Sequence, residues 1–211
     1  MDGFIFDLDG TLLDSSKDLT ISANFLLAHY GKETLSQDTV ISYVGDGLGL
    51  LIQRLLPDFS PIQIQEARAI FQSHYRLHWV DYTRPYPGVL ETLEYFREKV
   101  KVVISNKPQE ATREILKALG MAKYFSLMLG GDSLPACKPD PMPIFYTLKE
   151  FSLLPENTVM IGDGVPDIKA GKSAGIHTCA VTYGMRDASV LKKLEPEFMI
   201  DRFCQLQDIF G

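Results

Sequence analysis

Cysteine is scarce in this sequence, and its spacing excludes two classes of protein. The 211 residues include only three cysteines, Cys137, Cys179 and Cys204, which are odd in number and far apart. A secreted disulfide framework has a denser, even set of cysteines, and a zinc site has closely spaced ligands. The three thiols therefore indicate a reducing compartment.

An excess of positive charge is also missing. The chain has 21 lysines and arginines against 27 aspartates and glutamates, and its net charge at pH 7 is -6. Because nucleic-acid-binding proteins generally present a basic surface, we expect no nucleic-acid partner. An acidic protein still binds a small anion where positive charge is local.

Long apolar runs are absent as well. No stretch approaches the roughly 18 uncharged apolar residues of a membrane span. The first residues, Met1-Asp2-Gly3-Phe4, lack the basic and apolar regions of a signal peptide. We therefore expect a cytoplasmic protein without membrane contact, and the sequence does not distinguish a monomer from a homodimer.

What the sequence does contain is an alternation of short apolar strands with helices, in a chain that is 45% hydrophobic. This alternation is typical of an α/β fold with a doubly wound, mostly parallel sheet that helices cover on both faces. The predicted strands are 3–7, 100–104, 126–129, 158–161, 178–181 and 198–200. The predicted helices between them are 88–98, 109–119, 141–151 and 166–174.

A helical block interrupts this alternation directly after the first strand. Helices are predicted over 16–30, with Ser16 as N-cap, over 36–43 and 48–56, and from Ser60-Pro61 onward. We therefore predict two domains, an α/β core of residues 1–13 and 83–211 and a helical cap domain of residues 14–82. The cap leaves from the carboxyl ends of the strands, so we expect it to cover a site there.

Polar residues follow three of the predicted strands. Asp7, Ser105 and Asp163 each lie at a predicted strand end or just past it. Ligands of open α/β sheets bind at the carboxyl ends of the strands, so these residues define one predicted site.

Four segments that contain these residues resemble, in order, the four motifs of the haloacid dehalogenase-like superfamily. They are Asp7-Leu8-Asp9-Gly10-Thr11-Leu12, Ser105-Asn106, Lys138-Pro139-Asp140-Pro141, and Gly162-Asp163-Gly164 followed by Asp167. The match spans nearly the whole chain. Gly130-Gly131-Asp132 and the lysine motif are most similar to the phosphoglycolate phosphatase-like subgroup with a helical cap, which implies a Rossmann-like core and phosphatase activity.

The first motif supplies the predicted catalytic pair. Asp7 is the expected nucleophile, because a carboxylate can form an aspartyl-phosphate and divide hydrolysis into two easier steps. Asp9 is the expected acid and base for the leaving oxygen and the attacking water. Gly10 allows the turn that points both carboxylates the same way, and Thr11 supports it.

The resemblance implies a Mg²⁺ ion held by the Asp7 and Asp163 carboxylates and the Asp9 backbone carbonyl, since Mg²⁺ prefers oxygen ligands. Gly164 supports this site. Asp167, one helical turn after Asp163, is expected either to hold a metal-bound water or to orient Lys138.

The phosphate is expected to bind to the Ser105 hydroxyl, to a backbone or amide donor of Asn106, and to the Lys138 ammonium, which balances negative charge on the transferring oxygens. For Lys107, surface solvation and substrate contact remain equally open.

The cap offers weaker signals of specificity. Gly45 and Gly47 are candidates for close approach to a substrate, with a plain helix–helix turn as the alternative. Arg54 is a candidate for a bidentate bond to a substrate carboxylate, with an exposed arginine as the alternative. We expect the cap aromatics Phe71, Tyr75 and Trp79, and the pair His74 and His78, to be packing residues.

The resulting hypothesis is a Mg²⁺-dependent phosphatase that hydrolyses a small phosphorylated metabolite, phosphoglycolate or a similar phosphomonoester, through an aspartyl-phosphate. Alternatives are a pyrophosphatase or nucleotidase on the same core, a phosphosugar mutase, and a non-catalytic phosphate-binding regulator. A regulator would be expected to have lost Asp7 or Asp9, and both are present.

Overall fold

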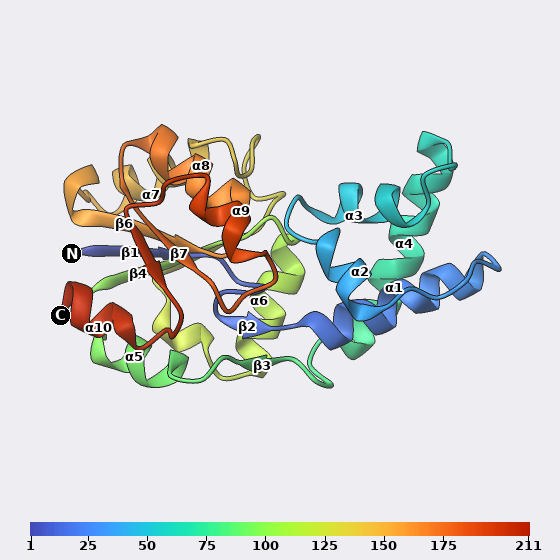
Figure 1. The fold of residues 1–211 in the computed structure, drawn as a ribbon, viewed down its shortest axis with the longest axis horizontal. Coiled ribbons are helices and arrows are strands. Elements are labelled where there is room, and N and C mark those ends of the chain that lie inside the picture. Colours follow the sequence, from blue (N-terminus) through green and yellow to red (C-terminus); the bar gives the residue numbers. More distant parts are fainter.

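A six-stranded parallel sheet forms the centre of the molecule in the computed structural model, which describes residues 1–211 (Figure 1). The strand order is β5-β4-β1-β6-β7-β8, and every neighbouring pair is parallel. The strands are β1 (Gly3–Phe6), β4 (Val100–Ile104), β5 (Leu127–Leu129), β6 (Thr158–Gly162), β7 (His177–Val181) and β8 (Phe198–Ile200). The predicted α/β class is therefore confirmed.

Helices cover both faces of this sheet, because successive side chains of a buried strand point to opposite faces. On β1, Phe4 and Phe6 pack in one apolar cluster and Ile5 packs in another. The first cluster contains residues of α5 (Val89–Tyr95), α6 (Gln109–Ala118) and α10 (Gln205–Phe210). The second contains residues of α7 (Met142–Glu150) and α8 (Val165–Ala174).

The order of the strands places a ligand site at the carboxyl end of β1. From β1 the chain builds β4 and β5 outward on one side, and it then crosses back to build β6, β7 and β8 on the other. The direction of winding therefore reverses beside β1, and this is where doubly wound folds bind ligands.

The helical insertion, residues 14–82, lies beyond this carboxyl edge of the sheet (Figure 1). It contains α1 (Ser16–His29), α2 (Gln37–Ser42), α3 (Leu48–Leu55) and α4 (Pro61–His78). As the sequence predicts, α4 begins with Ser60 as N-cap and Pro61 in its first turn, and Gln63 completes a capping box. Apolar residues of the insertion belong to the same contiguous cluster as Phe4 and Phe6.

Three short features differ from the prediction. A two-stranded antiparallel ribbon, β2 (Leu13–Asp14) with β3 (Arg84–Pro85), joins the two chain segments that connect the sheet to the insertion. Helix α9 (Ala188–Lys192) was also not predicted. Both are too short to show a hydrophobic period. The Ser16 cap is wrong by one residue, because Ser15 occupies the N-cap position.

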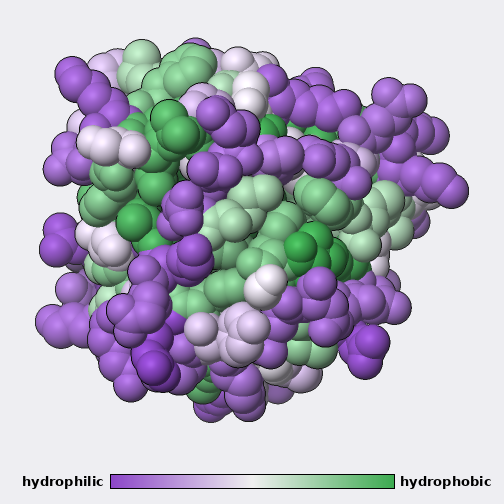
Figure 2. Space-filling view, turned by 90° about the vertical axis from the view of Figure 1, so that its left-hand side faces the viewer, coloured by the Kyte–Doolittle hydropathy of each residue, from purple (hydrophilic) through white to green (hydrophobic).

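The end of the molecule opposite the insertion is shown in Figure 2, where hydrophobic residues gather near the centre inside a hydrophilic surround. Both chain termini lie at this end (Figure 1). No helix combines the length and apolarity needed to cross a bilayer.

Candidate active site

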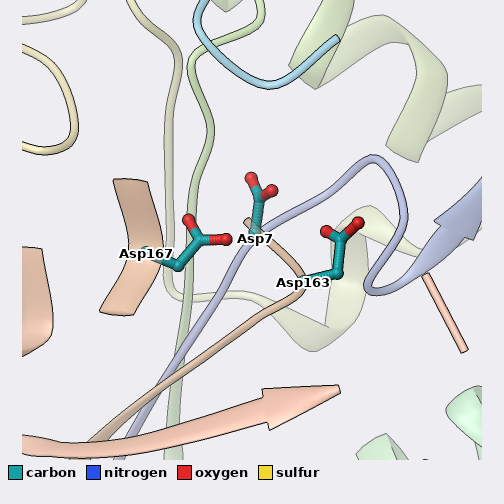
Figure 3. A group of neighbouring side chains, drawn as sticks. All are labelled: Asp7, Asp163 and Asp167. Carbon is teal, nitrogen blue, oxygen red and sulfur yellow. The ribbon is translucent and has the colours of Figure 1, made fainter. Parts of the chain in front are cut away.

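Three carboxylates converge at the carboxyl ends of β1 and β6. Phe6 and Ile161 are partners in the parallel ladder, so Asp7 and Asp163, which follow β1 and β6, leave the sheet side by side. Asp167 lies in the first turn of α8. The three carboxyl groups lie close together, and each offers an oxygen within 4.8 Å of the others (Figure 3).

Lys138 neutralises part of this charge. Its Nζ lies 2.8 Å from Asp7 Oδ1 and 2.6 Å from Asp167 Oδ1, and its side chain is 2% exposed. Burial alone would lower the pKa of Lys138, but Asp167 and Asp7 raise it above its ordinary value, so the ammonium stays charged. Burial and the Asp7 charge raise the pKa of Asp167 to about 6, with Lys138 opposing them.

Asp163 has no cationic side chain as a partner. Thr11 Oγ1 donates to its Oδ1 at 3.1 Å, and the Met185 backbone N–H donates to its Oδ2 at 2.7 Å. Burial, followed by the charges of Asp7 and Asp167, raises the pKa of Asp163 to about 8. A buried group of oxygens with too little positive charge is the environment that a hard divalent cation suits, so these residues fit a metal.

The turn predicted at Gly10 is needed for this arrangement. Gly10 has a φ of +83°, and a Cβ built on it would lie 2.2 Å from Asp163 Oδ2. Its backbone N–H bonds to the Leu13 carbonyl and closes the turn. Any side chain here would displace Asp163 and strain the backbone.

Asp9 is held by two partners that the sequence did not identify. Its Oδ1 accepts a hydrogen bond from Ser15 Oγ, and its Oδ2 accepts one from Lys107 Nζ, both at 2.6 Å. Lys107 is therefore not a solvated surface lysine, because its side chain is 5% exposed. Its ammonium pairs with Asp9, so any contact with a substrate would be made in addition to this ion pair. The feature of the sequence that indicates a place at the site is the position of Lys107 two residues after Ser105, in the same loop.

Ser105 keeps a free hydroxyl proton at the site. Its backbone N–H bonds to the Leu129 carbonyl, and its Oγ accepts from the Lys107 backbone N–H at 3.3 Å. The O–H remains available to a ligand, as the sequence predicts. The side chain is buried at the carboxyl end of β4.

The side-chain amide of Asn106 binds two backbone carbonyls, so it is not free for the predicted phosphate contact. Its Nδ2 donates to the backbone carbonyls of Gly45 at 3.0 Å and Lys138 at 2.8 Å. The amide thus ties the insertion to the lysine loop, and only the backbone N–H of Asn106 is left as a candidate phosphate donor.

A cavity of about 90 Å³ lies between the sheet edge and the insertion. The carboxylates of Asp7, Asp9 and Asp163 line one side, together with Ser105 and Lys107. The insertion lines the other side with residues that include Gly45, Gly47, Leu51, Phe71 and Tyr75. The predicted cap glycines are therefore at the cavity.

Arg54, a predicted candidate for a substrate contact, is not among the residues that line this cavity. Its Nη1 donates to the Tyr43 carbonyl at 2.7 Å, and its Nη2 pairs with Asp46 at 2.6 Å. The guanidinium therefore stabilises the loop between α2 and α3 without lining the cavity.

Arg186, which belongs to none of the sequence motifs, links the core to the insertion at the cavity. It follows β7, and its guanidinium donates to the carbonyls of Ser42 at 3.2 Å and Val44 at 2.9 Å. Arg76 of α4 pairs with Glu110 of α6 across the same boundary. All three charged side chains line the cavity.

Comparison with known families agrees with this geometry. A family model described as haloacid dehalogenase-like hydrolase matches residues 4–181. A protein of Haemophilus influenzae named phosphoglycolate phosphatase is 35% identical, over 97% of this chain and 96% of its own. Proteins of the same name from Aquifex aeolicus (36%, 94% and 91%) and Neisseria meningitidis (39%, 89% and 83%) are similar.

Solved structures show the same similarity in three dimensions. A crystal structure described as a predicted phosphoglycolate phosphatase from Haemophilus somnus superposes with a TM-score of 0.95. The two sequences are 32% identical, and the match covers 100% of this chain and 98% of that one.

Proposed function

The chain belongs to the haloacid dehalogenase-like hydrolase family, and from this premise we propose that it hydrolyses phosphoglycolate with the help of Mg²⁺. Its activity class is that of a phosphatase of phosphomonoesters. The observation that carries the proposal is the cluster of the Asp7, Asp163 and Asp167 carboxylates, two of which pair with Lys138. The substrate is proposed from the names of relatives that match nearly the whole chain.

In this proposal the Asp7 and Asp163 carboxylates and the Asp9 backbone carbonyl hold Mg²⁺. Asp167 is assigned to Lys138 instead, because its Oδ1 already pairs with the Lys138 ammonium, whereas Asp163 accepts hydrogen bonds only from neutral donors. When bound, the ion supplies positive charge that offsets the repulsion between a phosphate dianion and an anionic nucleophile.

Asp7 acts as the nucleophile. Lys138 holds its Oδ1, and this leaves Oδ2 to form the new bond to phosphorus while the ester P–O bond breaks. The Lys138 ammonium and the Ser105 O–H stabilise the charge on the transferring oxygens. Water then releases phosphate from the Asp7 acyl phosphate and restores the carboxylate.

Asp9 handles the protons of both steps. It gives a proton to the leaving alkoxide and takes one from the attacking water. The hydrogen bonds from Ser15 and Lys107, one to each of its oxygens, fix the orientation of the Asp9 side chain. One of these bonds must be given up before Asp9 donates to the leaving oxygen.

The insertion, residues 14–82, is proposed to be a cap domain that excludes bulk water during the reaction. Its contacts through Asn106 and Arg186 support a closed arrangement. The small cavity favours a compact ester over a nucleotide, because pockets for drug-sized ligands occupy about 300–1,000 Å³.

Phosphate release from a panel of substrates tests the proposal. We expect the protein with Mg²⁺ to prefer phosphoglycolate over a nucleoside monophosphate, a hexose phosphate and pyrophosphate, and to lose activity in excess chelator. Equal or better hydrolysis of another panel member would reject phosphoglycolate as the preferred substrate. Activity that survives in excess chelator would reject the proposed dependence on Mg²⁺.

The isosteric variant Asp7→Asn tests the nucleophile. We expect kcat to fall by about 10⁴-fold or more, because the amide cannot attack phosphorus. Mass spectrometry after acid quench should detect a phosphorylated form of the wild type and none of the variant. A variant that keeps its melting temperature and still turns over would refute Asp7 as the nucleophile.

A further inference from the structure

The hydroxyl of Tyr75 is buried at the cavity and has no hydrogen-bond partner in the protein. Tyr75 lies on α4 and is 5% exposed. Its ring packs beside Phe71, with ring centroids 5.6 Å apart, and beside Trp79 at 6.3 Å. The predicted packing role is therefore met, but a phenylalanine would meet it equally well.

An unpaired buried hydroxyl destabilises a fold, because it loses its hydrogen bonds to water and gains none in return. Burial raises the pKa of Tyr75 to about 12, against the opposing charge of Lys107, so the group is a neutral O–H donor. Since the protein supplies no acceptor, the acceptor that suits this position is one that a ligand brings.

Lys107 gives the same part of the cavity a positive charge. Its Nζ lies 4.9 Å from the centroid of the Tyr75 ring and 2.6 Å from Asp9 Oδ2. An ammonium has further N–H donors beyond the one that Asp9 accepts. A hydroxyl donor and a cation therefore lie together next to the predicted acid and base.

The other positive side chains of the cavity are already engaged. Arg76 pairs with Glu110, and Arg186 donates to two backbone carbonyls. The backbone N–H groups at the N-terminus of α3 add partial positive charge. No side chain of the helix compensates this charge, because the N-cap residue is Gly47 and the first turn has no acidic residue. Gly47 and Leu48 both line the cavity.

We propose that Tyr75 Oη–H, supported by Lys107 and the N-terminus of α3, binds the carboxylate at the non-phosphate end of the substrate. Tyr75 is then a specificity-determining residue, which distinguishes a phosphomonoester with a carboxylate from an alkyl ester of the same length. This inference rests on the proposed function, and it adds the group that recognises the acid.

Kinetics of the variant Tyr75→Phe on two substrates test it. We expect kcat/KM for phosphoglycolate to fall about 10- to 100-fold, mainly through KM, while kcat/KM for ethyl phosphate changes less than about threefold. Tyr30→Phe is the matched control, because Tyr30 packs on Phe59 outside the cavity and should alter neither substrate.

Two further measurements separate recognition from folding. The melting temperature of the metal-free Tyr75→Phe protein should equal or exceed that of the wild type, because the variant removes an unpaired buried group. Glycolate, the carboxylate product, should inhibit the wild type at least about tenfold more tightly than it inhibits the variant.

The outcomes distinguish this inference from the proposed function. If the wild type prefers phosphoglycolate and Tyr75→Phe keeps that preference, the inference is overturned while the proposed function stands. If both substrates lose the same factor, Tyr75 has only a structural role and the inference also fails. If the wild type does not prefer phosphoglycolate over ethyl phosphate, both the proposed substrate and its recognition by Tyr75 are rejected.

Discussion

The cavity has two walls that are built in different ways. On the sheet-edge wall, charged side chains pair with one another: Lys138 with Asp7 and Asp167, and Lys107 with Asp9. On the insertion wall, three bonds from the core are accepted by backbone carbonyls of residues 42–45, at the end of α2 and in the loop that follows it. The reactive groups are thus organised by the core itself, whereas the shape opposite them depends on how a backbone loop is held.

Each wall also contains a polar group whose charge or hydrogen-bonding capacity the protein does not compensate. On the sheet-edge wall this is Asp163, a buried carboxylate without a cation. On the insertion wall it is Tyr75, a buried donor without an acceptor. The first deficit is of positive charge and the second is of an acceptor, which are the deficits that a metal ion and an anionic substrate fill.

The strongest test of the sheet-edge wall removes Lys138. In Lys138→Met, we expect kcat to fall by about 10³-fold. The free energy of unfolding without metal should fall by about 3 kcal/mol, because Asp7 and Asp167 lose their common cation beside a third carboxylate, Asp163. Denaturant unfolding and phosphate release measure both effects.

The control for this loss is the exposed Lys149, whose change to methionine should alter neither quantity. The double variant Lys138→Met/Asp167→Asn should regain part of the stability and none of the activity. A single variant as stable as the wild type would contradict the charge balance inferred for this wall.

Metal binding should depend on pH with a defined sign. The pKa of Asp163 is raised from 3.8 to about 8 in the fold, so the metal-free folded protein holds a proton that the unfolded chain releases. The stability of the metal-free protein therefore falls as the pH rises from about 4 toward 8. Mg²⁺ must displace that proton, so it should bind more tightly as the pH rises.

Thermal unfolding with and without Mg²⁺ checks this expectation. At saturating Mg²⁺, about 100 times the dissociation constant, the stabilisation at pH 8 is about 2.7 kcal/mol, and it should be smaller near pH 5. Asp163→Asn should lose both the pH dependence and the response to Mg²⁺. An equal shift at the two pH values would contradict Asp163 as the group that exchanges a proton for the metal.

On the insertion wall, Arg186 should matter more than Arg76. Arg186→Gln loses two hydrogen bonds to the insertion, so we expect kcat/KM to fall by about tenfold. Hydrogen exchange should then increase around residues 42–47. Arg76→Gln breaks a largely exposed ion pair, and the change should stay within about threefold. The reverse order of effects would mean that α4, not the loop, holds the insertion closed.

The smallest effect is expected behind this wall, at Arg54. Arg54→Ala removes the bonds to Tyr43 and Asp46 and should lower the free energy of unfolding by about 1 kcal/mol. Because Arg54 does not line the cavity, kcat/KM for phosphoglycolate should stay within about twofold. A selective loss of phosphoglycolate hydrolysis would restore Arg54 as a substrate contact.

The sequence predicted the sheet-edge wall better than the insertion wall, and the residues show why. Asp7, Ser105 and Asp163 each end a short apolar strand, and parallel strands bring such ends to one edge whatever else the chain does. The partners of Asp9 were missed, because Lys107 pairs with it across 98 positions and no local period records such a pairing.

For the insertion, the sequence predicted helices and packing but not contacts. Only the charge of Arg54 makes it a candidate for a substrate contact, and the fold turns its guanidinium toward its own loop. Tyr75 was assigned to packing, and its ring does pack, but only the absence of a partner around its hydroxyl marks it as a candidate for recognition.

By itself, the sequence determined the α/β class, the helical insertion and the identities of the groups expected to perform the chemistry. These depend on local hydrophobic periods and on residues at strand ends, which short stretches of chain encode. Only the tertiary structure decided which charges are compensated, that Arg186 holds the segment of Ser42 and Val44, that Asp163 has no cation beside it and that the Tyr75 hydroxyl has no hydrogen-bond partner. Those properties depend on contacts between side chains that are far apart in the chain. Burial then decides how strongly a missing partner destabilises the fold.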